Sequence, residues 1–189
     1  MRAYEYVLVI GGTILWALPF PLAGFHGRSA LRLDRRARWG VLLECVGYTL
    51  LWQGSFWTRA TLAGRDALAA VLIATACVIS WTAARALGRQ LRVDAALGPQ
   101  HELVRSGPYG LVRHPIYTSM LCLLLGTGVV VAPWYLFLGG AAVFLIGTEI
   151  RMRVEEALLA AQFGEQFEAY RRTVPRLIPF TASMRRRAP

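Results

Sequence analysis

The stretch GPYGLVRHPIYTSM, residues 107–120, combines turn-forming residues with polar and aromatic side chains immediately before a long apolar run. Gly107 and Pro108 favour a turn. Pro115 fits the first turn of a helix, because the amide hydrogen that proline lacks would have no partner there. The other free amides at such a helix start favour an anionic group such as a carboxylate. The stretch can therefore meet an anionic group at the start of a helix.

The side chains of this stretch could also bind a cation or an aromatic ring. The faces of Tyr109 and Tyr117 can pack against either group, and His114 can donate or accept a hydrogen bond. The same residue types also occur without a site, because Arg-His pairs and tyrosines anchor membrane proteins at the level of the headgroups. Their combination with a second charged segment favours the functional interpretation.

The second segment, EIRMRVEEALLAAQFGEQFEAYRR, follows the last apolar run and is typical of an amphipathic helix. Its apolar positions are Met152, Leu158, Leu159, Phe163 and Phe167. Arg151 and Glu155 are four residues apart and therefore face the same side of a helix. The alternative to a binding role is that Glu155 and Glu156 are solvated partners of Arg151 and Arg153. Gly164 predicts an interruption or a turn in this helix.

The composition indicates an all-α, polytopic integral membrane protein. The chain has 189 residues, of which 56% are hydrophobic and 17% are charged. A helix needs about 20 apolar residues to cross roughly 30 Å of hydrocarbon. We expect one membrane domain with about five transmembrane helices, in which Ala132 and Pro133 join spans four and five in a tight helical hairpin. The expected spans are residues 6–22, 39–57, 66–84, 116–131 and 133–149.

All 21 basic residues are arginines, and their distribution predicts the orientation of the spans. Eighteen of them lie between spans one and two, between Arg85 and Arg113, or after span five, and three lie on the other side. Under the positive-inside rule, the N-terminus lies outside a cell (inner) membrane and the C-terminal helical region lies in the cytoplasm. The net charge of +10 could also indicate nucleic-acid binding, but arginines between apolar segments favour the membrane explanation.

Two segments together resemble the isoprenylcysteine carboxyl methyltransferase family and its bacterial relatives, and more distantly the phospholipid N-methyltransferases. They are HELVRSGPYGLVRHPIY and, one hairpin later, RMRVEEALLAAQFGEQFEAYRRTVPRLIPF. The spaced combination of RHPxY, EE, FG and a closing proline carries the resemblance. It covers about residues 66–180, the methyltransferase-like core, whereas residues 1–65, with the first two spans, add little.

This resemblance implies that S-adenosylmethionine binds at the cytoplasmic membrane surface. It implies a substrate-contacting, catalytic role for Arg151. The cofactor contacts that it implies are His101, Glu102, Leu103, Val104, Tyr109, His114, Pro115, Ile116, Tyr117 and Glu155. A further contact falls between Arg89 and Gln100, where the alignment is ambiguous.

We therefore expect an S-adenosylmethionine-dependent methyltransferase that acts on a lipophilic acceptor, such as the carboxylate of a prenylcysteine-like, isoprenoid or lipid molecule. The alternatives are an NADPH-dependent membrane reductase of the sterol-reductase type and a non-catalytic membrane protein for binding or assembly. The expected partners are the acceptor and membrane lipids, with no nucleic acid and no metal. The sequence leaves the acceptor atom and the oligomeric state open.

Glu44 lies within the second expected span, where an ionised carboxylate is unfavourable unless it is paired or near the interface. Its partner could be Arg85 or a cytoplasmic arginine, and a structural ion pair and a substrate contact are both open. His26 belongs to no pattern and is expected to be solvated. The cysteines, expected to be inert small apolar residues, are Cys45, Cys77 and Cys122.

The predicted orientation can be tested with reporter fusions. A reporter fused after Arg187 should be active only on the cytoplasmic side, because that segment follows the arginine-rich region. A reporter inserted near Gly64 should be active only on the opposite side. The same compartment for both reporters would mean that a span has been miscounted.

Overall fold

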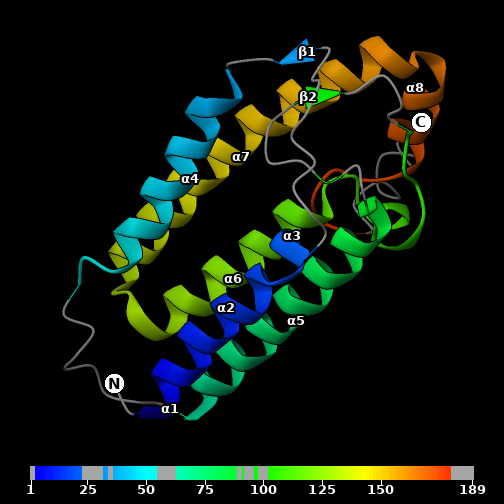
Figure 1. Ribbon diagram of the computed structural model, residues 1–189. Helices are drawn as coiled ribbons and strands as arrows, with labels where there is room; N and C mark the ends of the chain where they lie inside the picture. The colour runs from blue at the N-terminus through cyan, green and yellow to red at the C-terminus, as the bar shows by residue number, and fades with distance from the viewer. Residues whose placement is uncertain are drawn as a thin grey trace, which may run out of the picture.

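The computed structural model describes residues 3–22, 32–33, 36–54, 63–88, 91, 96–97 and 102–179. These ranges are almost entirely helical, which confirms the all-α class, and a pairing of two-residue strands is the exception (Figure 1). The elements are α1 (Ala3–Tyr6), the π-helical η1 (Val7–Gly11), α2 (Gly12–Ala17), α3 (Pro19–Leu22), β1 (Arg32–Leu33), α4 (Ala37–Leu51), α5 (Ala63–Leu87), β2 (Ala96–Leu97), the 3₁₀-helical η4 (Gly107–Gly110), α6 (Pro115–Val131), α7 (Trp134–Phe163) and α8 (Glu165–Thr173). Strands β1 and β2 are antiparallel.

Within the described ranges, three helical segments are long and apolar enough to cross a membrane. They are Ala3–Leu22, Gly64–Leu87 and Trp134–Phe163, and they correspond to expected spans one, three and five. The other two helices are shorter, with 15 residues in α4 and 17 in α6. A 15-residue α-helix is about 22 Å long, less than the hydrocarbon thickness. Spans two and four therefore stay predictions, and the expected end of span two at residue 57 lies outside the described residues.

The helix that contains expected span five does not end at Glu149, because α7 continues without a break to Phe163, and the expected membrane boundary at Glu149 stays a prediction. The segment after Glu149 contains neither proline nor glycine until Gly164, so nothing in the local sequence stops the helix. Gly164 then has a φ of +49°, a left-handed value that favours glycine, and α8 begins directly after it. The predicted interruption at Gly164 is confirmed, and one rigid helix carries both apolar and charged residues.

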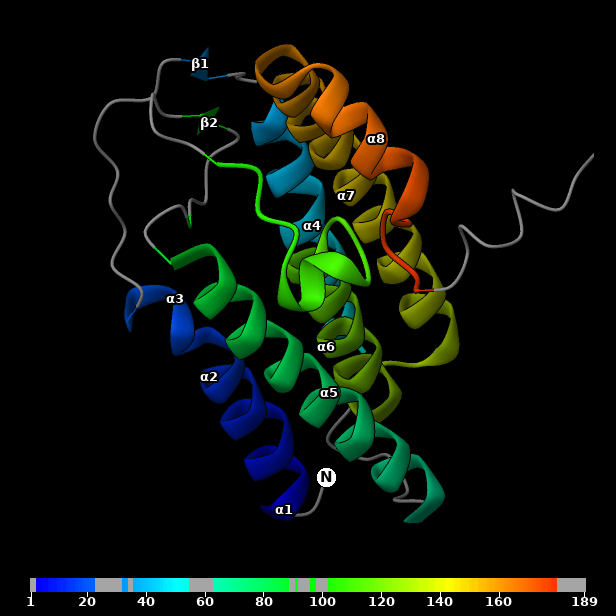
Figure 2. The ribbon, with the colours of Figure 1, turned by 90° about the vertical axis from the view of Figure 1, so that its right-hand side faces the viewer.

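Ala132 and Pro133 connect α6 to α7, as expected for a tight hairpin. The two arms then have different main partners, since α7 packs along α4 whereas α6 packs along α5 (Figures 1 and 2). Hydrogen bonds also join the two helix pairs, and in one of them the Tyr48 hydroxyl of α4 donates to the Met120 carbonyl of α6 at 2.7 Å. The apolar core between the helices includes Leu51, Leu123, Leu124, Val130, Val131 and Phe144.

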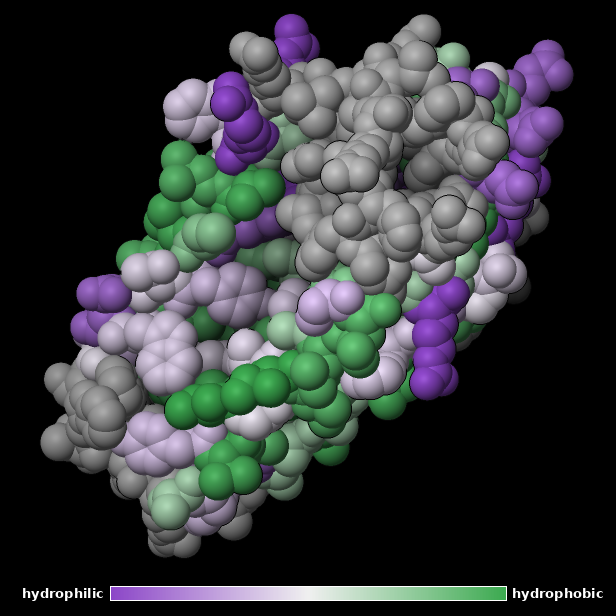
Figure 3. Space-filling model, in the orientation of Figure 1, coloured by the Kyte–Doolittle hydropathy of each residue, from purple (hydrophilic) through white to green (hydrophobic). Residues whose placement is uncertain are grey.

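Much of the outer surface is hydrophobic. In Figure 3, hydrophobic residues line the middle of the visible face, and hydrophilic residues gather toward the end where α8 lies. Large apolar side chains that are exposed include Val7, Leu22, Val71, Val78, Leu138 and Ile146. A soluble protein rarely exposes so much apolar surface without a partner, and acyl chains are the partner that a membrane-spanning helix requires.

Glycines allow α4 and α7 to approach until their backbones touch. A Cβ atom at Gly147 would lie 2.6 Å from the carbonyl oxygen of Gly40, and one at Gly47 would lie 2.7 Å from the carbonyl oxygen of Gly140. The two contacts are seven residues apart on each helix, so they repeat after about two turns on the same face. Small residues commonly mediate such close helix packing in membranes.

This contact can be tested with alanine substitutions on α7. Gly147→Ala should lower the apparent melting temperature in detergent, because the added methyl group collides with the α4 backbone and overpacking costs about 1–3 kcal/mol. Gly139→Ala is the matched control, since no atom lies within 4 Å of a Cβ at that position. It should leave the melting temperature unchanged or raise it, because alanine stabilises a helix. Equal behaviour of the two variants would contradict the close approach.

Candidate functional site

The candidate site lies where α6 begins beside the charged half of α7. Pro115 occupies the first position of α6, and His114 precedes it as the capping residue. The backbone before α6 is held by the segment that follows α8. The Arg113 amide donates to the Pro175 carbonyl at 2.8 Å, and the His114 amide donates to the Arg176 carbonyl at 3.0 Å. These bonds fix the direction in which the His114 side chain leaves the backbone.

The His114 imidazole lies between two neighbouring carboxylates of α7. Its Nδ1 is 3.5 Å from an oxygen of Glu155, and its Nε2 is 3.2 Å from an oxygen of Glu156. The imidazole is 5% exposed and the Glu156 side chain is 11% exposed, whereas the Glu155 side chain is 27% exposed. Glu155 is therefore the member of this triad that a ligand can reach most easily.

The charge of His114 is set by these two carboxylates. Burial alone would lower the pKa of the imidazole, but the hydrogen bonds and negative charges of Glu155 and Glu156 raise this pKa above its ordinary value. The imidazole consequently favours the protonated form, in which both ring nitrogens donate hydrogen bonds.

Tyr117 and Arg151 complete the cluster on the other side of Glu155. The Tyr117 hydroxyl donates a hydrogen bond to Glu155. The guanidinium carbon of Arg151 lies 4.9 Å from the centre of the Tyr117 ring, and Nη2 of Arg151 lies 4.0 Å from a Glu155 oxygen. The structure thus brings four predicted residues together, with Glu155 in contact with a cation on each side. We call His114, Tyr117, Arg151 and Glu155 the central cluster.

Glu156 has partners that sequence reasoning missed. One of its oxygens accepts hydrogen bonds from Nε of Arg113 and Nε of Arg176, both at 3.0 Å. Nη1 of Arg176 also lies 3.0 Å from both oxygens of Glu149. The alternative that paired Glu156 with Arg153 along the helix is wrong, because Arg153 instead pairs with Glu149 at 2.6 Å. The seven-residue spacing of Glu149 and Glu156, which places both on one face, was the available signal.

The partner of Glu44 is Arg151, one of the arginines expected on the cytoplasmic side, and not Arg85. The Glu44 carboxylate is buried and accepts a hydrogen bond from Nη1 of Arg151 at 2.8 Å. The Thr148 hydroxyl donates to its other oxygen at 3.1 Å. Helix α4 therefore reaches the central cluster through one acidic side chain.

Tyr109 lies in the η4 turn and is buried. Its carbonyl oxygen accepts a hydrogen bond from the Tyr170 hydroxyl at 2.6 Å, which ties the turn to α8. Burial raises the pKa of the Tyr109 phenol, and the negative charge of Glu155 raises it further. The phenol therefore stays neutral.

Other predicted cofactor contacts are not members of the central cluster. Glu102 is exposed, and Leu103 and Val104 are half-buried in the extended segment before η4. Ile116 is half-buried in the first turn of α6. His101 lies outside the described residues.

The structure shows free thiols and no metal cluster in the part of the chain that it describes. Cys45 is exposed, Cys77 is buried and Cys122 is intermediate, and none of them forms a disulfide. Among the described residues, no group of three or more histidine, cysteine, aspartate and glutamate side chains is arranged to hold a metal ion.

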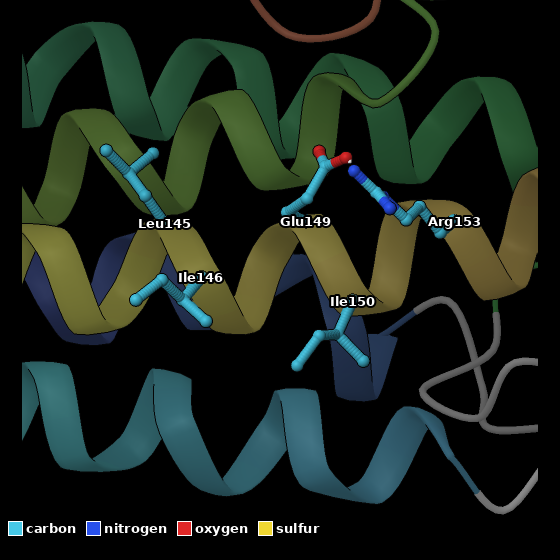
Figure 4. A pocket seen from close by; sticks show the side chains of 5 residues that line it. All are labelled: Leu145, Ile146, Glu149, Ile150 and Arg153. Atoms are coloured by element: carbon cyan, nitrogen blue, oxygen red, sulfur yellow. Dashed lines mark hydrogen bonds and ion pairs between the residues drawn. The ribbon is translucent and has the colours of Figure 1, made fainter.

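A shallow pocket of about 350 Å³ lies on α7 beside this region (Figure 4). It is lined by Leu145, Ile146, Glu149, Ile150 and Arg153. Glu149 and Arg153 point toward one another at one end of the pocket, Leu145 and Ile146 lie about one turn earlier, and Ile150 lies between the two charged residues along α7. Because Glu149 also binds Arg176, the charged end of the pocket is connected through Glu156 to His114.

The sequence model of the phospholipid methyltransferase family matches residues 65–166, more than half of the chain. Protein-S-isoprenylcysteine O-methyltransferase of Schizosaccharomyces pombe is 37% identical over 79 residues, which cover 42% of this chain and 34% of the relative. Methanethiol S-methyltransferase of Crocosphaera subtropica is 33% identical over 72 residues, which cover 38% of this chain and 27% of the relative. The chain thus spans about a third or less of the length of these two relatives.

The nickel-cobalt-cadmium resistance protein NccN of Alcaligenes xylosoxydans xylosoxydans is similar over a longer stretch. It is 27% identical over 165 residues, which cover 86% of this chain and 70% of the relative. The family match covers α5, α6 and all but the last part of the charged helical region, so it includes the central cluster. Together with the two methyltransferase relatives, it confirms the resemblance predicted from the sequence.

The raised pKa of His114 predicts a pH dependence of stability. A histidine whose pKa is higher in the folded chain than in the unfolded chain stabilises the folded chain. This stabilisation is complete below the unfolded pKa, about 6.5, and it is lost as the pH rises through the pKa of the folded chain. The groups that face the imidazole are Glu155, Glu156 and the Tyr117 ring. The melting temperature of the wild type, minus that of His114→Gln, should be largest near pH 6 and should shrink toward pH 9. A constant difference over this range would contradict the assigned charge.

Proposed function

Because the chain belongs to the phospholipid methyltransferase family, we propose that it is an S-adenosylmethionine-dependent methyltransferase acting on a lipophilic acceptor at the cytoplasmic membrane surface. The observation that carries this proposal is the central cluster, in which two cationic side chains and a tyrosine converge on Glu155 where α6 begins. Both relatives with more than 30% identity described above are methyltransferases by name, although they are named for different acceptors.

The residues of the central cluster fit the chemistry of this cofactor. The partly exposed Glu155 carboxylate can bind an ammonium group or ribose hydroxyls, and the Tyr117 ring can stabilise a sulfonium by a cation–π interaction. The first amides of α6 have no acceptor within the helix and favour a carboxylate. S-adenosylmethionine would supply an electrophilic methyl group on its sulfonium. Every charged part of the cofactor thus has a complementary group in this small region.

Arg151 is the residue that we assign to the acceptor. A guanidinium can hold a carboxylate through two parallel hydrogen bonds and so align it for in-line attack. Methyl transfer depends mainly on such alignment, because no proton has to move when the acceptor is already anionic. Transfer of a methyl group from a sulfonium to a carboxylate also removes one positive and one negative charge. A site shielded from water favours such a reaction. The buried position of Arg151 supports this shielding.

The surrounding surface supports an acceptor that arrives from the bilayer. The pocket on α7 carries aliphatic side chains toward the apolar half of the helix and the Glu149–Arg153 ion pair toward the charged half. This order matches a molecule with an apolar chain and a polar head. We propose a carboxylate of a prenylcysteine-like, isoprenoid or lipid molecule as the acceptor, and the arginine distribution supports a site on the cytoplasmic side.

Titration of the purified protein with S-adenosylmethionine and with NADPH tests the proposed cofactor. Binding of S-adenosylmethionine without NADPH supports the methyltransferase. Binding of NADPH instead would identify a reductase of the sterol-reductase type, and binding of neither would indicate a non-catalytic membrane protein.

Substitutions on α7 separate the proposed roles of Arg151 and Glu155. Glu155→Ala should weaken S-adenosylmethionine binding by more than tenfold, because it removes the carboxylate at the centre of the cluster. Arg151→Ala should abolish transfer, and Arg151→Lys should rescue it poorly, because an ammonium group does not reproduce the planar guanidinium. Arg151→Lys should also leave cofactor affinity within a few fold, since it keeps a positive charge beside Glu44 and avoids an unpaired buried carboxylate.

Arg153→Ala is the matched control for these variants. The Arg153 side chain is 75% exposed and pairs along the helix with Glu149, and such exposed pairs contribute only about 0.3–0.5 kcal/mol. It should leave cofactor affinity close to that of the wild type. If Glu155→Ala bound the cofactor as tightly as this control and Arg151→Ala transferred the methyl group as fast as the wild type, the proposed site would be wrong.

A further inference from the structure

Helix α4 lies outside the segment that matches the family, yet it contributes a carboxylate to the central cluster. The family match begins at residue 65, whereas Glu44 lies near the middle of α4. Glu44 is 2% exposed, and its two oxygens accept hydrogen bonds from Arg151 and Thr148. All three side chains in this group are buried, so the arrangement is part of the helix packing and not a surface ion pair.

The close approach of α4 to α7 places Glu44 within reach of Arg151. A Cβ atom at Gly40 would lie 2.4 Å from Cγ of Arg151, so the arginine stem runs directly over this glycine. The next turn of α4 then presents Glu44 to the guanidinium at the end of that stem. A buried carboxylate is strongly unfavourable unless it is paired, and the same holds for a buried guanidinium. Each group therefore restricts where the other can lie.

The pairing also determines how the guanidinium is turned. Nη1 of Arg151 is bound by Glu44 at 2.8 Å, whereas Nη2 lies 4.0 Å from Glu155 and the guanidinium carbon lies 4.9 Å from the Tyr117 ring centre. Rotation of the guanidinium away from this orientation would break its shortest bond. The hydrogens on the Nη2 side are consequently held toward the central cluster.

We propose that Glu44 is a positioning residue that orients Arg151 and competes with the anionic group of the acceptor for its guanidinium. The inference rests on the proposed role of Arg151 in acceptor binding. An acceptor carboxylate that reaches Arg151 meets a guanidinium whose charge is already balanced by Glu44, so binding is weakened but the bound group is correctly aligned. Glu44 thereby lowers the affinity for the acceptor but improves the alignment of the bound acceptor. It also determines how strongly the site selects anionic acceptors.

The competition can be measured without turnover by using a simple carboxylate amphiphile. Binding of sodium dodecanoate is compared with that of dodecanol in a non-ionic detergent, for the wild type and for Glu44→Gln. Removal of the competing charge should tighten dodecanoate binding by about tenfold, the effect of one charge-assisted hydrogen bond, and leave dodecanol unchanged. The double variant Glu44→Gln/Arg151→Gln should lose this gain. Unchanged or weaker dodecanoate binding by Glu44→Gln would overturn the proposal.

Glu44→Asp covers the case in which Glu44→Gln does not fold. It keeps the negative charge but withdraws the carboxylate from Arg151 by one methylene group, so dodecanoate should bind more tightly than to the wild type. An affinity equal to that of the wild type would count against competition for the guanidinium.

A turnover measurement then separates positioning from a merely structural role. With N-acetyl-S-farnesylcysteine as the carboxylate probe, Glu44→Gln should lower both KM and kcat, because the acceptor binds more tightly but is less well aligned. S-adenosylmethionine affinity should stay within a few fold. Glu5→Gln is the matched control, since Glu5 is also buried near an arginine but lies in α1, and it should leave kcat and KM unchanged. A purely structural role would lower the melting temperature without changing KM.

The two proposals fail in different ways. A wild-type protein that neither binds S-adenosylmethionine nor methylates the probe would refute the proposed function, while the dodecanoate comparison would still decide whether Glu44 competes for Arg151. A protein that methylates the probe normally after Glu44→Gln would retain the proposed function and refute the positioning role.

Discussion

Charges on the buried side of α7 have to be paired, and the rest of the molecule is arranged to pair them. One continuous 30-residue helix begins as an apolar segment and carries five charged side chains between Glu149 and Glu156. Where this helix is covered by its neighbours, an isolated charge would lose its hydration without compensation. Arg151 and Glu156 are both buried, and each is bound by groups from other parts of the chain.

Three separate segments supply these partners. Helix α4 provides Glu44, the start of α6 provides Arg113 and His114, and the segment after α8 provides Arg176. Backbone hydrogen bonds between the last two segments hold them in register. The charge pairing therefore also assembles the site, because the groups that neutralise α7 are the groups that surround Glu155.

Glu155 is more exposed than Glu156, its neighbour on α7, so one of two adjacent carboxylates is open to a ligand and the other is enclosed. Glu156 is held by three cationic side chains, and such a group has little capacity left for a ligand. Glu155 keeps contact with solvent while it is flanked by His114, Tyr117 and Arg151. A charged cluster of this kind beside apolar helices suits the proposed reaction, whose two substrates come from water and from lipid.

Local features of the sequence determined the helical class, the hairpin at Ala132 and Pro133, and the break at Gly164, because proline and glycine act on their own few residues of backbone. The grouping of His114, Tyr117, Arg151 and Glu155 was also predictable, although from a motif and not from geometry. The continuity of α7 past Glu149 was not predictable from hydropathy, because charged residues end an apolar run without ending a helix.

Only the tertiary structure decided the partners of the buried charges. Glu44 and Arg151 are 107 residues apart, and Arg113 and Glu156 are 43 residues apart. Helical periodicity relates residues within a few turns of one helix, and it contains no information on which helix lies opposite. That choice depends on the close approach of α4 to α7 through their glycines and on the path of the chain after α8, since both are set by packing over the whole molecule.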